Sequence, residues 1–317
     1  MSQNVFDTQT KYQRKFIAKV KNKGIDVALK WLKKQGDKDF SIPNKLTLKW
    51  KGKKDKYIVE ISENVDFTNA QKIISNKNSC NVENLKIGQT YYWRVDGGKI
   101  KSFKTLSNGV RFIHLEGMSN VRDLGGKKIK QGVIFRGSEL EGKFNDITAN
   151  GRYYFENVLK IKSEIDLRAL DYTEKTTSAI DGVKMIKISY RPYIEVFEQQ
   201  HKEELCEIME FLSDKDNYPV YFHCIQGADR TGMIALFLKA LCGEDEQDVL
   251  LDYELTSLGR IPKLDPRSRN FDYFKKFIEE LSKYAPNQSL QNKVKAFMLD
   301  CGISEESINK TVEILTK

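Results

Sequence analysis

Residues 219–243 read PVYFHCIQGADRTGMIALFLKALCG, and this stretch decides the fold of the longer part of the chain. The apolar run 220–223 predicts a buried strand, a turn around Gly227 follows, and residues 231–241 predict an amphipathic helix. A strand, a tight loop and a helix start together point backbone N–H groups at an anion. The stretch therefore predicts an anion site at the end of a strand.

The same stretch places a cysteine at that anion site. Cys224 stands six positions before Arg230, and in such a loop the planar guanidinium can fold back over a held phosphate. Because a phosphate dianion repels nucleophiles, the thiol must be ionised before the substrate arrives. The N-terminus of one helix stabilises a thiolate by only ~0.3 to 2 kcal/mol. We therefore expect the loop amides, Arg230, the Thr231 hydroxyl and His223 to stabilise the thiolate together.

Residues 223–232, His-Cys-x-x-Gly-x-Asp-Arg-Thr-Gly, resemble the signature loop of cysteine-dependent protein tyrosine phosphatases. The likeness is greatest to a bacterial group of tyrosine and lipid phosphatases with dual-specificity-like folds. Four further segments are similar to that group and occur in the same order, within roughly residues 112–260. They are NVRDLGG at 120–126, IFRGSEL at 134–140, IDLR at 165–168 and DYELT at 252–256.

The resemblance implies a role for each residue of the loop. Cys224 would form a phosphocysteine intermediate and Arg230 would bind the phosphoryl group. Asp229 matches the position of the general acid in this group, and like charge from a bound phosphate favours the protonated form that an acid needs. The alternative for Asp229 is a carboxylate that braces the loop. The amides expected to hold the phosphoryl oxygens are those of Ile225, Gln226, Gly227, Ala228, Asp229 and Arg230.

The neighbouring motifs supply weaker candidates. Asp123 and Asp166 each precede a leucine in a motif that can be purely structural, so we expect both to be structural. Arg122 and Arg168 either form salt bridges that hold the loops or extend the anion site. Ala228 departs from the pattern, because many lipid-active relatives carry a lysine there that would meet further phosphates of an inositol ring.

These features predict a phosphoric monoester hydrolase that acts on phosphotyrosine protein or peptide, or on a small phosphoester. A phosphoinositide or inositol polyphosphate phosphatase is the alternative substrate class. A silent phosphate-binding or docking protein is the alternative from another class, and arsenate reductases and sulfur transferases also use loops of this kind. The three histidines are not in metal-ligand spacing and no CxxC or HExxH occurs, so we expect no metal and no other cofactor.

The chain before this domain divides into two parts. Residues 1–40 predict an N-terminal helical segment with two short amphipathic helices that pack on a neighbouring domain; a membrane-surface helix is the alternative. Residues 41–107 alternate with period two, which predicts an antiparallel sandwich. This part resembles a fibronectin type III module, with Trp50 in its core and Tyr91 at the tyrosine corner. Strands are expected at 46–50, 57–61, 91–95 and 100–103.

Residues 108–317 predict an α/β domain with a mostly parallel central sheet flanked by helices. Strands are expected at 133–135, 163–167, 184–188 and 220–223, alternating with helical stretches. The tail from 245 to 317 is expected to be nearly all helix, with Ser304 as the N-cap of the last one.

Charge is distributed unevenly along the chain. Residues 1–110 hold 23 Lys and Arg against 10 Asp and Glu, a net +13, which leaves −4 for residues 111–317. A lysine-rich solvated surface is the plain interpretation of the basic front third, and an acidic partner or an anionic surface is the alternative; the pattern does not support specific nucleic-acid binding. Five scattered cysteines indicate reduced thiols. No apolar run approaches the ~18 residues of a membrane span, and no secretory signal is evident. We expect a cytoplasmic protein, or an extracytoplasmic one if a leader has been removed.

Overall fold

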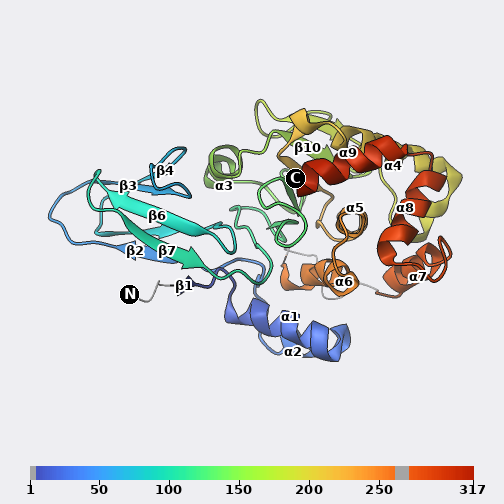
Figure 1. Ribbon diagram of the computed structural model, residues 1–317, viewed down its shortest axis with the longest axis horizontal. Coiled ribbons are helices and arrows are strands. Elements are labelled where there is room, and N and C mark those ends of the chain that lie inside the picture. The colour runs from blue at the N-terminus through green and yellow to red at the C-terminus, as the bar shows by residue number, and fades with distance from the viewer. Residues whose placement is uncertain (1–4, 261–270) are drawn as a thin grey trace.

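The computed structural model describes residues 5–260 and 271–317. Two N-terminal helices, a small β module and a larger α/β domain follow one another along the chain (Figure 1). The predicted N-terminal segment includes residues 1–4 and the predicted helical tail includes residues 261–270, and both stretches lie outside the described residues. Among the described helices, none combines the length and the apolar character that crossing a membrane requires.

The N-terminal helices α1 (Lys11–Lys23) and α2 (Ile25–Lys33) lie where the amphipathic pattern predicts them. They meet at Gly24, whose φ of 80° suits glycine. Their apolar faces are buried against α6 and the turn that follows it, below the α/β domain in Figure 1. These faces are therefore occupied by the protein itself, as expected for helices that pack on a neighbouring domain. The buried side chains of this contact are Phe16, Ala28, Leu32, Phe40, Phe112, Leu251, Leu255 and Leu258.

The β module has a five-stranded sheet of order β1-β7-β6-β3-β4 and a two-stranded sheet β2-β5. Alternate residues such as Val59, Trp93 and Phe103 point into one core between the sheets. The period-two pattern predicted β2, β3, β6 and β7, but not the short or polar strands β1, β4 and β5. The strands are β1 Val5–Phe6, β2 Leu46–Lys49, β3 Tyr57–Ser62, β4 Gln71–Ser75, β5 Ser79–Val82, β6 Thr90–Val95 and β7 Lys101–Thr105.

The α/β domain is built on a sheet of order β11-β10-β12-β9-β8. All neighbours are parallel except β8 and β9, which confirms the predicted mostly parallel sheet. In the register, His223 lies opposite Asp166, and Asp166 lies opposite Lys187. The carboxyl ends of three strands therefore meet where the signature loop begins. The strands are β8 Arg122–Asp123, β9 Ile134–Gly137, β10 Ser163–Asp166, β11 Lys184–Lys187 and β12 Val220–His223.

Helices cover both faces of this sheet. Val220 and Phe222 of β12 enter the large core under α4, α5 and α8, whereas Tyr221 between them enters a second core with Phe155. The helices and turns are α3 Ala149–Tyr153, η1 Tyr154–Val158, η2 Tyr193–Phe197, η3 Gln199–His201, α4 Lys202–Leu212, η4 Lys215–Asn217, α5 Asp229–Leu241, α6 Glu246–Glu254, η5 Leu255–Leu258, α7 Phe271–Leu281, α8 Leu290–Asp300 and α9 Glu305–Thr316. The last of these is capped by Ser304 as predicted.

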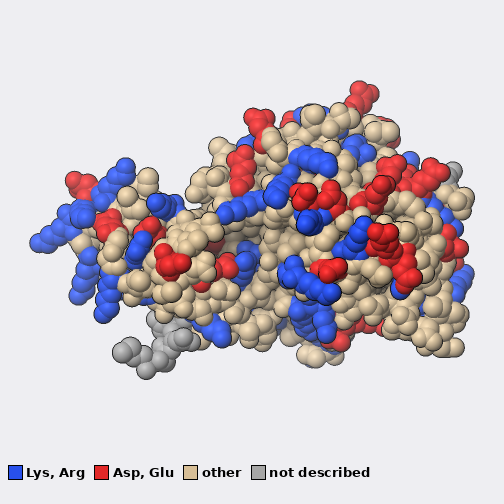
Figure 2. All heavy atoms as spheres, turned by 45° about the horizontal axis from the view of Figure 1, so that its top comes forward, with Lys and Arg blue, Asp and Glu red and all other residues tan. Residues whose placement is uncertain are grey.

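Surface charge follows the division of the chain. Figure 2 shows Lys and Arg side chains crowding the β module, at the left of that view, and mixed charges over the α/β domain. The exposed lysines of the module include Lys49, Lys51, Lys53, Lys54, Lys56, Lys72, Lys77, Lys99, Lys101 and Lys104.

Candidate active site

The signature loop runs from the end of β12 to the start of α5. Cys224 follows the strand directly and is 5% exposed, and α5 begins at Asp229, two residues before the predicted start. Gly227 has a φ of 65°, and a Cβ added there would lie 2.2 Å from the carbonyl oxygen of Gly137. The loop therefore needs glycine at this position both for its backbone conformation and for its close approach to β9.

The carbonyl groups of the loop are all tied to surrounding structure. Each has a partner at hydrogen-bond distance: His223 Nδ1 at 3.1 Å from Cys224 O, Glu139 N at 3.1 Å from Ile225 O, Asn120 Nδ2 at 3.1 and 2.9 Å from Gln226 O and Gly227 O, and Gly232 N at 2.8 Å from Ala228 O. Arg136 also donates to Gly227 O. Because the carbonyls are held on one side, the peptide N–H groups are directed to the other side of the loop.

The donors of the loop lack acceptors within residues 5–260 and 271–317. The N–H groups of residues 225–228 donate to no described backbone or side-chain atom, and neither does the Arg230 guanidinium. The Thr231 hydroxyl is buried and without a partner among the described residues. A buried donor without an acceptor, such as the Thr231 hydroxyl, costs about 1–3 kcal/mol, and successive backbone N–H groups without acceptors are typical of an anion site.

His223 is fully buried behind the cysteine. Its Nε2 lies 2.8 Å from Glu164 Oε1, and its Nδ1 lies 4.0 Å from Asp166 Oδ1 as well as close to Cys224 O. Burial alone would lower the pKa of His223, but the charge of Asp166 and the hydrogen bond to Glu164 outweigh it and raise that pKa. A protonated imidazole can donate to Glu164 and to Cys224 O at once, so His223 can hold the first peptide of the loop in place.

Asp229, the proposed acid, begins α5 and meets two phenols. Tyr193 from η2 donates to Asp229 Oδ1, and the hydroxyl of Tyr253 from α6 lies 3.4 Å from the same oxygen. The two phenol oxygens are 2.6 Å apart. The first residue of the helix therefore carries a carboxyl whose orientation depends on two other elements.

Arg122 forms part of a buried ion cluster. Its Nε lies 2.8 Å from Asp252 Oδ1, and its Nη1 donates to Asn120 Oδ1 at 2.5 Å. Arg136 Nη1 lies 2.5 Å from Asp252 Oδ2. Burial would raise the pKa of Asp252, but the two guanidinium groups lower it well below its usual range. This arrangement favours the first of the two predicted roles for Arg122, a salt bridge that holds the loops.

Arg168 lies in a second cluster, which includes His223 at the start of the loop. Its Nη2 lies 2.8 Å from Asp166 Oδ2 and its Nη1 lies 3.1 Å from Glu139 Oε2, while Lys187 Nζ is 2.8 Å from Asp166. Burial opposes ionisation of Asp166, but His223, Arg168 and Lys187 overcome it and lower the pKa of Asp166. The arrangement favours structural roles for both Asp166 and Arg168.

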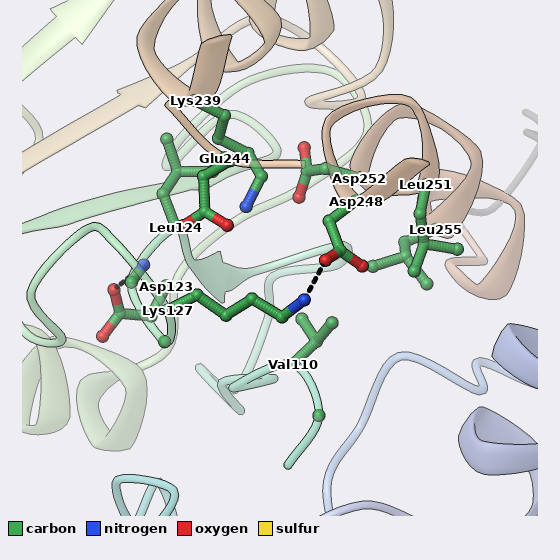
Figure 3. Close-up of a pocket in the computed structure, with 13 residues that line it drawn as sticks. Val110, Asp123, Leu124, Lys127, Lys239, Glu244, Asp248, Leu251, Asp252 and Leu255 are labelled. Atoms are coloured by element: carbon green, nitrogen blue, oxygen red, sulfur yellow. Dashed lines mark hydrogen bonds and ion pairs between the residues drawn. The ribbon is translucent and has the colours of Figure 1, made fainter. Parts of the chain in front are cut away.

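Asp123 is placed away from the loop. It accepts from Arg111 Nη1 at 2.7 Å and from the backbone N–H groups of Gly125 and Gly132 at 2.8 and 2.6 Å, so it braces a turn, which favours the structural role expected for it. It also lines a small cavity in which the ammonium group of Lys239 points between Glu244 and Asp252 (Figure 3). This cavity contains no residue of the signature loop.

Several residues that shape the loop were not among the predicted site residues. Asn120, Arg136 and Asp252 lie inside the motifs that resemble phosphatases, and a charged Arg136 within an apolar strand was a usable signal. Glu164 also stands in a predicted buried strand, one residue before the IDLR motif. Tyr193 carried no comparable signal, because the sequence around it has an ordinary composition.

Comparisons with known proteins identify the family of this chain. Residues 113–300 match the sequence profile described as the tyrosine phosphatase family. No curated protein matches the chain. Among solved structures, it is similar to the core catalytic domain of the PP-IP phosphatase SIW14 from S. cerevisiae in complex with citrate, at 17% sequence identity and a TM-score of 0.32, over 50% of this chain and 91% of that chain. The match over residues 113–300 spans more than half of the protein, so the chain belongs to the tyrosine phosphatase family and is a phosphoric monoester hydrolase.

Proposed function

We propose that this enzyme hydrolyses phosphotyrosine in proteins or peptides, with Cys224 as the nucleophile and Asp229 as the general acid. One observation carries the proposal: the amides of residues 225–228, the Arg230 guanidinium and the Thr231 hydroxyl lack acceptors among the described residues, while the loop's carbonyls all have partners. A phosphoryl group would supply oxygen acceptors to those donors.

In the first step, the Cys224 thiolate attacks the phosphorus atom. An S–P bond forms and the bond from phosphorus to the tyrosyl oxygen breaks, and that oxygen takes a proton from the Asp229 carboxyl. Arg230 and the amides of the loop hold the three equatorial oxygens, where charge is greatest in the transition state. The Thr231 hydroxyl can donate to the thiolate when it returns as a leaving group.

In the second step, water attacks the phosphocysteine. The Asp229 carboxylate, left ionised by the first step, takes a proton from that water as the new P–O bond forms. The S–P bond breaks, inorganic phosphate leaves and the Cys224 thiolate is restored. Asp229 ends protonated, ready for another cycle, so protons and electrons balance over the two steps.

The β module supports a second part of the proposal, that residues 41–107 form a fibronectin type III-like module. Strands β3, β6 and β7 share one sheet and β2 pairs with β5 in the other, as in sandwiches of that type. Tyr91 accepts a hydrogen bond from Lys86 N–H at 2.8 Å, five residues upstream, as a tyrosine corner does. We infer that its basic surface serves to dock an acidic partner.

The substrate class is tested by comparing wild type, Cys224→Ser and Asp229→Asn. p-Nitrophenyl phosphate reports the chemistry, and a panel of phosphotyrosine peptides, phosphoinositides and inositol polyphosphates ranks substrates. We expect no turnover by Cys224→Ser, reduced turnover by Asp229→Asn, and the highest kcat/KM with phosphotyrosine peptides.

Other outcomes point to the alternatives. A preference for inositol polyphosphates or phosphoinositides would overturn the peptide assignment and leave the mechanism standing. If reduced wild type turned over nothing on the panel but bound phosphate, the loop would be a docking site and the mechanism would be wrong.

A further inference from the structure

The Asp229 carboxyl is held by a pair of phenols that the mechanism above does not use. Tyr193 donates to Asp229 Oδ1, and the hydroxyl of Tyr253 lies 2.6 Å from the Tyr193 oxygen and 3.4 Å from Asp229 Oδ1. Tyr193 has one proton to donate and gives it to the carboxyl, so Tyr253 acts as the donor to Tyr193. The three groups form a chain that ends on a single oxygen of Asp229.

Both phenols are fixed by helix α7. The Tyr193 ring stacks on Tyr273, with centroids 5.9 Å apart, and the Tyr253 ring lies flat on Phe274 at 3.7 Å and 3°. Tyr193 also has a φ of 62°, which is uncommon for a bulky residue and is kept only where surrounding structure imposes it. The surrounding structure therefore holds Tyr193 in an unfavourable backbone conformation. In this conformation the Tyr193 hydroxyl contacts Asp229.

Tyr193 is a constant donor. Burial, followed by the charges of Asp229 and Tyr253, raises the pKa of Tyr193 far above its ordinary value. Tyr193 consequently keeps its proton at any pH at which the enzyme would work. A donor that never titrates can hold a carboxyl oxygen in both protonation states of the acid.

We propose that Tyr193, supported by Tyr253, is a positioning residue that fixes the Asp229 carboxyl through Oδ1 for proton exchange with the leaving group and with water. This inference rests on the proposed function, because it assigns a task to the acid of that mechanism. A carboxyl that rotates freely would present either oxygen at varying distances, and small errors in placing a catalytic group are costly.

The test compares two leaving groups in the Tyr193→Phe variant. Phenolate is a poor leaving group and needs the proton, whereas p-nitrophenolate is stable enough to depart without full protonation. We expect kcat for phenyl phosphate to fall about tenfold further than kcat for p-nitrophenyl phosphate, as part of the ~10²–10⁴ that a positioned acid contributes. KM should stay nearly constant, since Tyr193 does not hold the phosphoryl group.

Tyr190→Phe is a matched control. The Tyr190 hydroxyl is buried three residues away and has no partner within the described part of the chain. Tyr190→Phe removes a phenol hydroxyl from the same segment without changing a contact of Asp229. The ratio of kcat for the two substrates should therefore equal that of wild type. Equal melting temperatures of the two variants would show that both remain folded.

A double-mutant cycle separates this inference from the proposed function. In an Asp229→Asn background, Tyr193→Phe should have no further effect on the leaving-group ratio, because its effect passes through the carboxyl. If Tyr193→Phe lowers kcat equally for both substrates while Cys224→Ser is inactive, the positioning role is wrong and the proposed function stands. If Cys224→Ser keeps its activity, the proposed function itself fails.

Discussion

Two buried ion clusters flank the signature loop, and they differ in charge balance. The first joins Arg122 and Arg136 to one carboxylate, Asp252, and so has an excess of positive charge. One of the two arginines also contacts the loop, because Arg136 donates a hydrogen bond to the carbonyl oxygen of Gly227. The first cluster therefore holds the backbone of the loop directly.

The second cluster is closer to neutral. Arg168 meets Asp166 and Glu139, and His223 meets Glu164 as well as Asp166. Two of its cations thus have a second carboxylate if Asp166 is lost. The comparison shows that the effect of removing a buried charge depends on how many partners each remaining ion keeps, not only on its burial.

The largest expected effect is that of Asp252→Asn. This change leaves two buried guanidinium groups with no carboxylate in the cluster, so the free energy of unfolding should fall by about 3–5 kcal/mol. Urea unfolding of the purified variant measures it. Asp248→Asn, in the same helix, loses only partly exposed pairs with Lys21 and Lys127 and should cost less than about 1 kcal/mol. Similar losses in the two variants would contradict the comparison.

Asp166→Asn should have a smaller effect. Arg168 keeps Glu139 and His223 keeps Glu164, and Lys187 alone loses its carboxylate, against two guanidinium groups in Asp252→Asn. We therefore expect a loss of about 1–3 kcal/mol by the same urea measurement. A loss as large as that of Asp252→Asn would mean that the remaining carboxylates do not compensate. In the variant that carries both Asp252→Asn and Asp166→Asn, the losses of unfolding free energy should be nearly additive, because the clusters share no ion pair.

The smallest expected effect is a pH dependence that arises from the second cluster. The pKa of His223 is raised in the folded state, so its charge adds stability that is fully present below the unfolded value of about 6.5. That stability is lost as the pH rises through the higher folded pKa. Unfolding free energies measured from pH 6 upward should therefore decline in wild type.

His223→Asn provides the control for this dependence. Its unfolding free energy should be lower than that of wild type near pH 6 and should change less with rising pH. An equal slope in both proteins would assign the decline to another group. The first cluster should behave in the opposite direction, since the lowered pKa of Asp252 makes its contribution disappear only as the pH falls below about 4.

Much of the fold was accessible from local patterns. The strands at 163–167, 184–188 and 220–223 were predicted, and β10, β11 and β12 lie within those limits. Among them β12 is the short, fully buried apolar run expected of a central parallel strand. The two N-terminal helices were predicted from their apolar spacing and from Gly24. Strands β1, β4 and β5 were not, because each is short or polar and depends on its neighbours in the sheet for stability.

For the site, the sequence by itself determined the order of groups along the loop: Cys224, Gly227, Asp229 and Arg230 at spacings that suit an anion. Only the tertiary structure decided which groups hold that loop. Asn120, Arg136 and Tyr193 are 36 to 107 residues away from their partners in the chain. Local periodicity reports which side of an element is buried, but the pairing of distant polar groups follows from how the sheet and helices pack. Only the folded protein could therefore show which ions each buried charge pairs with, and that two phenols contact Asp229.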